Sequence, residues 1–295
     1  MQLILNAFRL NVDARAVRCQ IRTGVEPAAM KGLRDQFKND WFLHFRDGNV
    51  YGIPLSETAT PFGQTEDLDP KSHQALSLLS ARFNEIATEI DRRGHQIAVH
   101  AIGDGAVRTT IDGYEAAQRA NGKRDSRHRI EHIELIDRAD VPRLGALGIT
   151  ASVQPPHAPG AMDFAMFPTL DVIGRDRWAD AYLCRDLAAA GAPLAFASDW
   201  PVTDISVLRG IQAALTRPTY EGAADQRVPL MEILRAYTAG GAWAAHMDHV
   251  TGTLRPGMAA DIVVLSGDIE AAPAKDVAGM GVALTIAGGQ VTHRA

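Results

Sequence analysis

The feature that most constrains this chain is an alternation of short apolar runs with amphipathic segments, repeated from residue 68 onward. The apolar runs are QIAVHA (96–101), RIEHI (129–133), ITASVQ (149–154) and PLAFAS (193–198). Helical spacing and helix-end signals predict helices at about 69–93, 104–118, 140–147, 177–190, 207–216 and 230–245. Strands that alternate with helices in this way indicate parallel βα units.

The two ends of the chain do not show this alternation of strands and helices. The segments GTLRPGMAADIVVLSGD (252–268) and ALTIAGGQVTHR (283–294) predict short strands joined by glycine turns. A small all-β tail therefore follows the α/β body. Residues 1–67 show weak periodicity and many turn signals, such as Asp47-Gly48, and predict no definite element.

Composition and charge exclude several classes of function. Hydrophobic residues make up 46% of the 295 residues and charged residues 22%, which is the ordinary globular balance. The formal net charge is −5 and no basic stripe is present, so a nucleic acid is not an expected partner. No apolar stretch reaches the roughly 20 residues of a membrane span. We therefore expect a small-molecule substrate and no membrane partner.

The cysteine content and the first residues of the chain indicate in which cellular compartment the protein is expected. Cys19 and Cys184 are the only cysteines, and their separation encodes neither a disulfide framework nor a cysteine zinc site. The start of the chain lacks a basic leader and a small-residue cleavage site, so it does not read as a signal peptide. These observations predict a cytoplasmic protein.

Candidate chemistry lies at the carboxyl ends of three predicted strands. His100 and His132 come at the ends of their apolar runs, and Asp199 directly follows PLAFAS. In parallel α/β barrels, groups at these strand ends converge on one face. Two imidazoles and one carboxylate suit a divalent metal, most simply zinc, that activates a water molecule. Asp199 could then take the proton of that water and pass it to a leaving group.

Each of these residues also has a purely structural interpretation. A histidine after an apolar strand is more often hydrogen-bonded in the core, and this holds for His100 and His132 alike. Asp199 is as readily an N-cap of the next helix, and Asp104 is better explained as a cap than as a catalyst. Gln154 and His157 are candidate substrate-binding residues, although the prolines around them favour a rigid loop first.

Several blocks of the sequence together resemble one known family. They are VHAIGDGAV (99–107), RHRIEHIEL (127–135), LGITASVQPPHA (147–158), GAPLAFASDWPV (191–202), AYTAGGAWAA (236–245) and GTLRPGMAADIVVL (252–265). Their order and content are similar to the metal-dependent amidohydrolase superfamily, in the amidohydrolase 3 branch of YtcJ-like and N-substituted formamide deformylase-like proteins. The resemblance covers residues 68–295 and identifies the chain with the C-terminal part of the family's chain.

The resemblance implies a fold and an organisation into three parts. The fold class is α/β, an incomplete (β/α)₈ TIM-type barrel with a small C-terminal β segment of a composite β-sandwich. Residues 68–250 would form the C-terminal half of the barrel and residues 251–295 the sandwich strands. Residues 1–67 are assigned only as a partial barrel or insert region.

The resemblance also implies chemistry. The activity would be metal-dependent hydrolysis of carbon–nitrogen bonds other than peptide bonds, in amide-like or cyclic amide substrates. His100, His132 and Asp199 match metal ligands, and Asp199 also matches the residue that carries the proton. Trp200 matches a residue that shapes the substrate pocket, and Asp261 matches a structural position in the sandwich.

The chain departs from the family pattern at two points. The family's first barrel strand ends in an HxH pair of metal ligands, but only His44 precedes His73 here. The family's bridging lysine would fall in FLHFRDGNVYGIPLSETA (42–59), yet no lysine lies between Lys38 and Lys71. A bridged two-metal centre is therefore not expected, and metal bound by two histidines and one aspartate alone would be under-coordinated.

Two hypotheses follow. Four βα units make about half of a barrel, and a half barrel leaves strand edges and apolar faces uncovered. The chain is then either a hydrolase completed by a missing N-terminal half or by another copy in a homo-oligomer, or a catalytically inactive remnant without the HxH arm. A carboxylate-based glycosidase is a weaker alternative, because Asp199 has no convincing second acid.

Overall fold

The structure is a computed structural model that describes residues 20–21, 43–46, 49–52, 83–162, 164–167, 170 and 173–295. The chain divides into two compact units. The described residues of the N-terminal unit lie in Arg15–Ala151 and Ala189–Ala192. The described residues of the C-terminal unit lie in Ser152–Ala188 and Pro193–Ala295.

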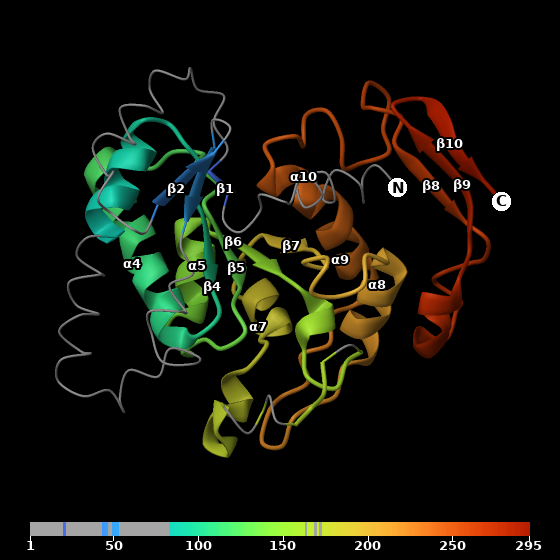
Figure 1. Cartoon of the computed structure of the whole chain (residues 1–295), viewed down its shortest axis with the longest axis horizontal. Coiled ribbons are helices and arrows are strands. Elements are labelled where there is room, and N and C mark those ends of the chain that lie inside the picture. The colour runs from blue at the N-terminus through green and yellow to red at the C-terminus, as the bar shows by residue number, and fades with distance from the viewer. Residues whose placement is uncertain are drawn as a thin grey trace. The chain divides into compact units, whose positions relative to one another are not determined.

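The N-terminal unit is built on two parallel strands, β4 (Ala98–Ala101) and β5 (Arg129–His132). Helices α4 (Asp104–Asn121) and α5 (Val141–Leu147) follow these strands in the chain (Figure 1). The largest fully buried side chains of the unit are aliphatic: Ile90, Ile111, Ile130, Ile133, Leu135, Ile136, Leu144 and Ile149. The alternation of strand and helix predicted from the sequence is confirmed here.

The helix before β4 ends where the sequence predicts. Residues 83–92 are helical, and Gly94 adopts a φ of 85°, a left-handed conformation that glycine supplies at low cost. The predicted opening of this helix at Asp69-Pro70 lies outside the described residues. The sequence predicts Asp104 as the cap of α4, but the N-cap is Gly103 and Asp104 lies in the first turn. Its carboxylate there faces the positive end of the helix dipole.

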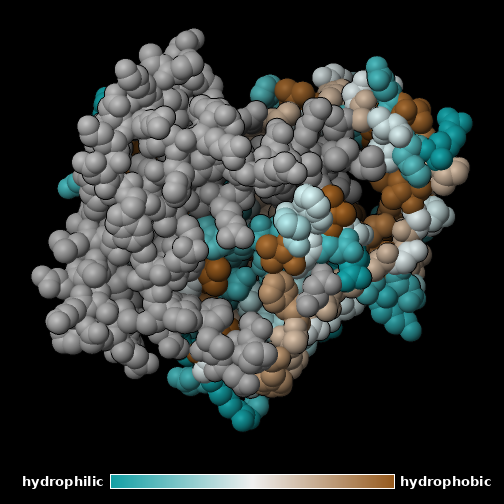
Figure 2. Space-filling view, in the orientation of Figure 1, coloured by the Kyte–Doolittle hydropathy of each residue, from teal (hydrophilic) through white to brown (hydrophobic). Residues whose placement is uncertain are grey.

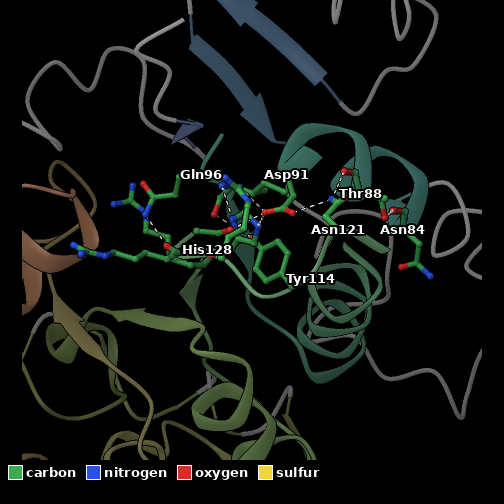
Figure 3. A network of polar contacts seen from close by, with 12 residues as sticks. Asn84, Thr88, Asp91, Gln96, Tyr114, Asn121 and His128 are labelled. Atoms are coloured by element: carbon green, nitrogen blue, oxygen red, sulfur yellow. Dashed lines mark hydrogen bonds and ion pairs between the residues drawn. The ribbon is translucent and has the colours of Figure 1, made fainter. Parts of the chain in front are cut away.

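A buried polar network ties the helix over 83–92 to the start of β5 (Figure 3). Asp91 is 2% exposed and its carboxylate accepts four hydrogen bonds. The donors are His128 Nε2 at 3.1 Å, Arg124 at 2.7 Å, Ser126 at 2.7 Å and Asn121 at 2.9 Å. Burial alone would raise the pKa of Asp91, but these hydrogen bonds outweigh it and hold the pKa well below its usual range.

His128 connects this network to the parallel sheet by hydrogen bonds. Its Nδ1 accepts the backbone N–H of Ile97 at 3.0 Å, so the ring proton lies on Nε2, which donates to Asp91. The ring of Tyr114 packs 4.8 Å from the His128 ring, and its hydroxyl donates to the Arg129 carbonyl at 2.9 Å. The network therefore fixes the amino ends of β4 and β5, the strands that carry His100 and His132.

A second sheet of the N-terminal unit is antiparallel. It contains β1 (Gln20–Ile21), β2 (Leu43–Arg46) and β3 (Asn49–Gly52) in the order β1-β3-β2. The turn signal Asp47-Gly48 separates β2 from β3, which pair antiparallel with Arg46 opposite Asn49. The stretch aligned with the family's lysine strand thus contributes an antiparallel hairpin.

The parallel sheet continues through β6 (Thr150–Val153) and β7 (Leu194–Phe196) in the order β4-β5-β6-β7. Backbone bonds bracket β6: Thr150 N–H donates to His128 O at 2.8 Å, and Ala197 N–H donates to Val153 O at 3.1 Å. A mixed α/β fold with a parallel four-stranded sheet and a separate antiparallel sheet agrees with the predicted class. The incomplete barrel stays a prediction.

The helices of the C-terminal unit differ in detail from the predicted ones. The helix predicted over 177–190 is divided into a 3₁₀ helix (Arg175–Asp180) and α7 (Cys184–Ala189). Tyr182, in the break between them, has a φ of 56°, which a continuous α-helix does not allow. Helix α8 (Val207–Thr216) has the predicted bounds. The helix predicted over 230–245 is α9 (Leu230–Arg235), a π-helical turn (Ala236–Gly240) and α10 (Gly241–Ala244).

The chain ends in the predicted all-β tail. Strands β8 (Ile262–Leu265), β9 (Val282–Ala287) and β10 (Gln290–Arg294) form an antiparallel sheet in the order β10-β9-β8. Asp261, only 3% exposed, joins this sheet to the preceding loop by accepting from Thr251 Oγ1 at 2.9 Å and Gly288 N–H at 2.7 Å. These bonds fit the structural role expected for it.

Three further observations concern the surface, the helices and the cysteines. Figure 2 shows apolar side chains among polar ones on the face in view, and the exposed large apolar residues include Val264 of β8 and Val291 of β10. Among the described residues, no helix combines the length and apolar character that crossing a membrane requires. Cys184 is a buried free cysteine, and Cys19 lies outside the described residues.

Candidate metal site

His100 and His132 meet in the N-terminal unit, at the carboxyl ends of β4 and β5. Nε2 of His132 lies 2.6 Å from Nδ1 of His100, and the two rings are edge-to-face with centroids 4.2 Å apart. His132 is 7% exposed. The predicted pair of imidazoles is therefore brought together by neighbouring parallel strands.

The contact between the two histidine rings depends on a distortion of the backbone at His132 and Ile133. The register pairs His100 with Glu131, so regular strand alternation would send the His132 side chain to the opposite face from His100. His132 has a φ of 80° and Ile133 a φ of 50°, which ends the regular alternation at this residue. A left-handed non-glycine residue costs about 1–3 kcal/mol, and such residues cluster at functional sites.

His157 and Asp199 come together in the C-terminal unit. His157 ends a 3₁₀ turn (Pro155–His157) directly after β6, and its side chain is buried. Its backbone N–H donates to Gln154 O at 2.9 Å, and its ring packs 5.0 Å from the ring of Phe164. One ligand atom of His157 and one of Asp199 lie within 4.8 Å of each other. The proline-rich loop therefore aims a histidine at the predicted proton carrier.

Asp199 occupies a second left-handed position, with a φ of 54°. It lies in a turn between β7 and α8, and its carbonyl accepts the N–H of Val202 at 2.8 Å. The alternative role as a helix cap is wrong for this residue. The N-cap of α8 is Ser206, whose Oγ accepts from Arg209 N–H at 3.4 Å.

The two remaining predicted residues flank these groups in the chain. Gln154 is 6% exposed, and its Nε2 donates weakly to Ser152 O at 3.4 Å. Within the described part of the chain, Gln154 Oε1 is a buried acceptor with no hydrogen-bond partner. Trp200 is 43% exposed and follows Asp199 directly. A buried amide acceptor and an exposed indole therefore lie next to His157 and Asp199 in the chain.

The sequence predicts the six candidate residues described above. It does not predict a role for two others, Ser198 and Thr203. Ser198 and Thr203 hold the turn at Asp199 by hydrogen bonds, and both are buried. The segment SDWPVT (198–203) contained the signal, because hydroxyl side chains beside a turn commonly bond its backbone.

Comparison with known proteins identifies relatives for most of the chain. It is 35% identical over 232 residues to the protein LONG AFTER FAR-RED 3 of Arabidopsis thaliana and 29% identical over 209 residues to the putative amidohydrolase YtcJ of Bacillus subtilis. It is 27% identical over 203 residues to the N-substituted formamide deformylase of Arthrobacter pascens. These matches cover 77%, 68% and 67% of this chain but only 39%, 38% and 36% of the relatives. The chain thus spans about two fifths of the length of the curated relatives it matches.

A solved structure and a family model complete the comparison. An uncharacterized metal-dependent hydrolase from Pyrococcus furiosus shares the fold with a TM-score of 0.53 at 23% identity, over 77% of this chain and 47% of that chain. The resemblance to the YtcJ-like and deformylase-like branch is confirmed by the relatives of those names. A model described as the amidohydrolase family matches residues 12–293, and the chain therefore belongs to that family.

Proposed function

We propose that this chain carries the metal-binding and proton-transfer residues of a hydrolase that cleaves non-peptide carbon–nitrogen bonds in amide-like or cyclic amide substrates. The observation that carries the proposal is the close approach of His157 and Asp199, whose ligand atoms lie within 4.8 Å of each other. Membership of the amidohydrolase family supports the reaction class.

The donor set fits a divalent metal, and we propose zinc. Among the described residues of the C-terminal unit, His157 and Asp199 each offer a ligand atom, and these two atoms lie within 4.8 Å of each other. Imidazole nitrogen and carboxylate oxygen are the zinc ligands of catalytic sites. We propose that His100, His132 and Asp199 bind the ion as the sequence predicts. His157, first expected to contact substrate, is proposed as a further donor because of its distance to Asp199.

The chain's own residues would share the chemistry as follows. A bound divalent ion would activate water and polarise the scissile carbonyl group. The Asp199 carboxylate would take a proton from the attacking water and deliver it to the leaving nitrogen, as a general base and then a general acid. His100 Nδ1 and His132 Nε2 lie 2.6 Å apart, so the two rings lie together at the strand ends, where each would have to offer a nitrogen lone pair to the ion.

Substrate contacts are proposed for two residues. The unpartnered Oε1 of Gln154 would accept a hydrogen bond from the substrate N–H, because a buried acceptor without a partner is costly when left unpaired. The exposed indole of Trp200 would cover an apolar substituent next to Asp199. Both contacts suit a substituted amide of small size.

The test uses the purified chain loaded with zinc and a panel of N-substituted formamides and cyclic amides, with product release as the measurement. N-substituted formamides are included because one relative of the chain is an N-substituted formamide deformylase. Asp199→Asn is expected to abolish hydrolysis and to leave the far-UV circular dichroism spectrum unchanged. The matched control is Asp204→Asn, which changes an acid 48% exposed on the same loop and should retain activity.

Two results would contradict the proposal. Turnover by Asp199→Asn equal to that of the unaltered chain would remove Asp199 from proton transfer. A chain that binds zinc but releases no product from any substrate of the panel would favour the alternative, a non-catalytic amidohydrolase domain without the HxH arm.

A further inference from the structure

Two of the hydrogen bonds in the Asp199 turn are made to Ser198. Ser198, 6% exposed, accepts at both of its oxygens: its Oγ takes the N–H of Trp200 at 3.2 Å, and its carbonyl takes the hydroxyl of Thr203. Thr203 is itself only 4% exposed, so no water competes for its hydroxyl. These two bonds close a short loop of chain with Asp199 inside it.

This loop decides where the Asp199 side chain points. A φ of 54° is a conformation that L residues other than glycine rarely adopt, so the peptide on either side of Asp199 must be held for it to persist. Ser198 fixes the peptide before Asp199, and its bond to Trp200 fixes the peptide after it. Relaxed to an ordinary negative φ, Asp199 would present its carboxylate in a different direction.

The strand and the helix on either side do not replace these bonds. Ala197 N–H, two residues before Asp199, donates to Val153 O of β6. Helix α8 begins only after Ser206, whose backbone N–H and hydroxyl are bonded to Asp204 and Arg209. Between these two anchors, the bonds around Asp199 include those of Ser198 and Thr203 and the one from Val202 N–H to the Asp199 carbonyl at 2.8 Å.

We propose that Ser198 and Thr203 are positioning residues that hold the Asp199 carboxylate in the orientation required for metal binding and proton transfer. This inference rests on the proposed function of Asp199. Neither side chain needs to touch metal or substrate, because both act through the backbone of Asp199. Groups that orient metal ligands typically change metal affinity or activity by about 10–100-fold when they are removed.

Thr203→Val tests the inference with little change of shape, because valine replaces the hydroxyl by a methyl group. The measurement is zinc affinity of the metal-free chain, by competition with a chromophoric chelator. We expect the zinc Kd to rise by about 10-fold or more, and kcat to fall while KM changes little. Thr203→Ser keeps the hydroxyl and should restore both values.

A matched control separates positioning from general loss of a hydroxyl. Thr216 Oγ1 donates to the Gln212 carbonyl at 2.7 Å, the same kind of bond made within α8. Thr216→Val should leave the zinc Kd unchanged. Ser198→Ala provides a second variant, which removes only the acceptor for Trp200 N–H and should also weaken zinc binding.

The outcomes distinguish this inference from the proposed function. No zinc binding by the unaltered chain would overturn the metal site, and the positioning role with it. Zinc binding by the unaltered chain with the same Kd in Thr203→Val and Ser198→Ala would overturn the positioning role alone. Loss of zinc binding in Thr203→Val that Thr203→Ser does not restore would also contradict it.

Discussion

The buried carboxylate of Asp91 offers the sharpest test of how the N-terminal unit is held together. We consider Asp91→Asn, which keeps the shape of the side chain. The three donors that meet Oδ1 could still bond the amide oxygen, but an NH₂ group would replace Oδ2 and face the Nδ2–H of Asn121. One hydrogen bond to a charged group is lost, worth about 1.5–3 kcal/mol, and two donors are left facing each other.

The loss of charge adds to this cost. Arg124 Nη2 lies 2.7 Å from Oδ1 of Asp91, and the ion pair that disappears has a carboxylate side chain 3% exposed and a guanidinium side chain 35% exposed. Removing one partner of a buried pair costs about 3–5 kcal/mol, and the partial exposure of Arg124 and the retained bonds to the amide oxygen lower that figure. We therefore expect Asp91→Asn to reduce the free energy of unfolding by about 3 kcal/mol at pH 7.

The same group predicts a pH dependence with a definite sign. Hydrogen bonds outweigh burial and keep the folded-state pKa of Asp91 below its ordinary value, so the ionised form stabilises the fold. This contribution is complete above the unfolded pKa of about 3.9 and is lost as pH falls below it. Between pH 5 and pH 3 the unaltered chain should lose about 1.2 kcal/mol that Asp91→Asn does not lose.

Urea unfolding followed by far-UV circular dichroism measures both effects. Asp125→Asn is the matched control, because the Asp125 side chain is 63% exposed and pairs with the nearby Arg127. It should change stability by less than about 0.5 kcal/mol. An Asp91→Asn variant as stable as the control, or one with the same pH slope as the unaltered chain, would refute the reasoning.

Two further changes test packing and capping. Gly145→Ala should cost about 1–3 kcal/mol in thermal unfolding, because a Cβ there collides with the carbonyl oxygen of Ala190, whereas Gly279→Ala meets no atom within 4 Å and should be neutral. Equal melting temperatures for the two variants would contradict this packing. Gln226→Ala removes the Oε1 that accepts the N–H groups of Arg185 and Asp186 at 3.1 Å, and hydrogen exchange at both amides should become about 10-fold faster. Unchanged exchange would show that α7 needs no cap from Gln226.

Much of the fold could be read from the sequence because its signals are local. Helix α8 has the predicted bounds, and the four apolar runs became the four strands of the parallel sheet. The break at Tyr182 and the π-helical turn at Ala236–Gly240 depend on tertiary packing, and periodicity does not reveal them. Packing of the turn against β7 is close, since a Cβ on Gly240 would collide with the Leu194 carbonyl oxygen.

The candidate site was predictable in composition more than in geometry. Strand ends predict His100, His132 and Asp199 as candidate residues, because the carboxyl ends of parallel strands share one edge. The left-handed backbone at His132 and Asp199 was not predictable, since neither is glycine and no local pattern marks them. The approach of His157 to Asp199 depends on a 3₁₀ turn. The sequence predicts a rigid loop there instead, because three prolines lie close together.

Metal content per chain tests the central claim most directly. Elemental analysis of the purified chain, dialysed after zinc loading, should find about one tightly held divalent ion per chain. The same analysis on His132→Ala and Asp199→Ala should find it largely lost, while the control Asp204→Asn should retain it. No bound metal in the unaltered chain, or equal metal in all of these variants, would contradict the proposed site.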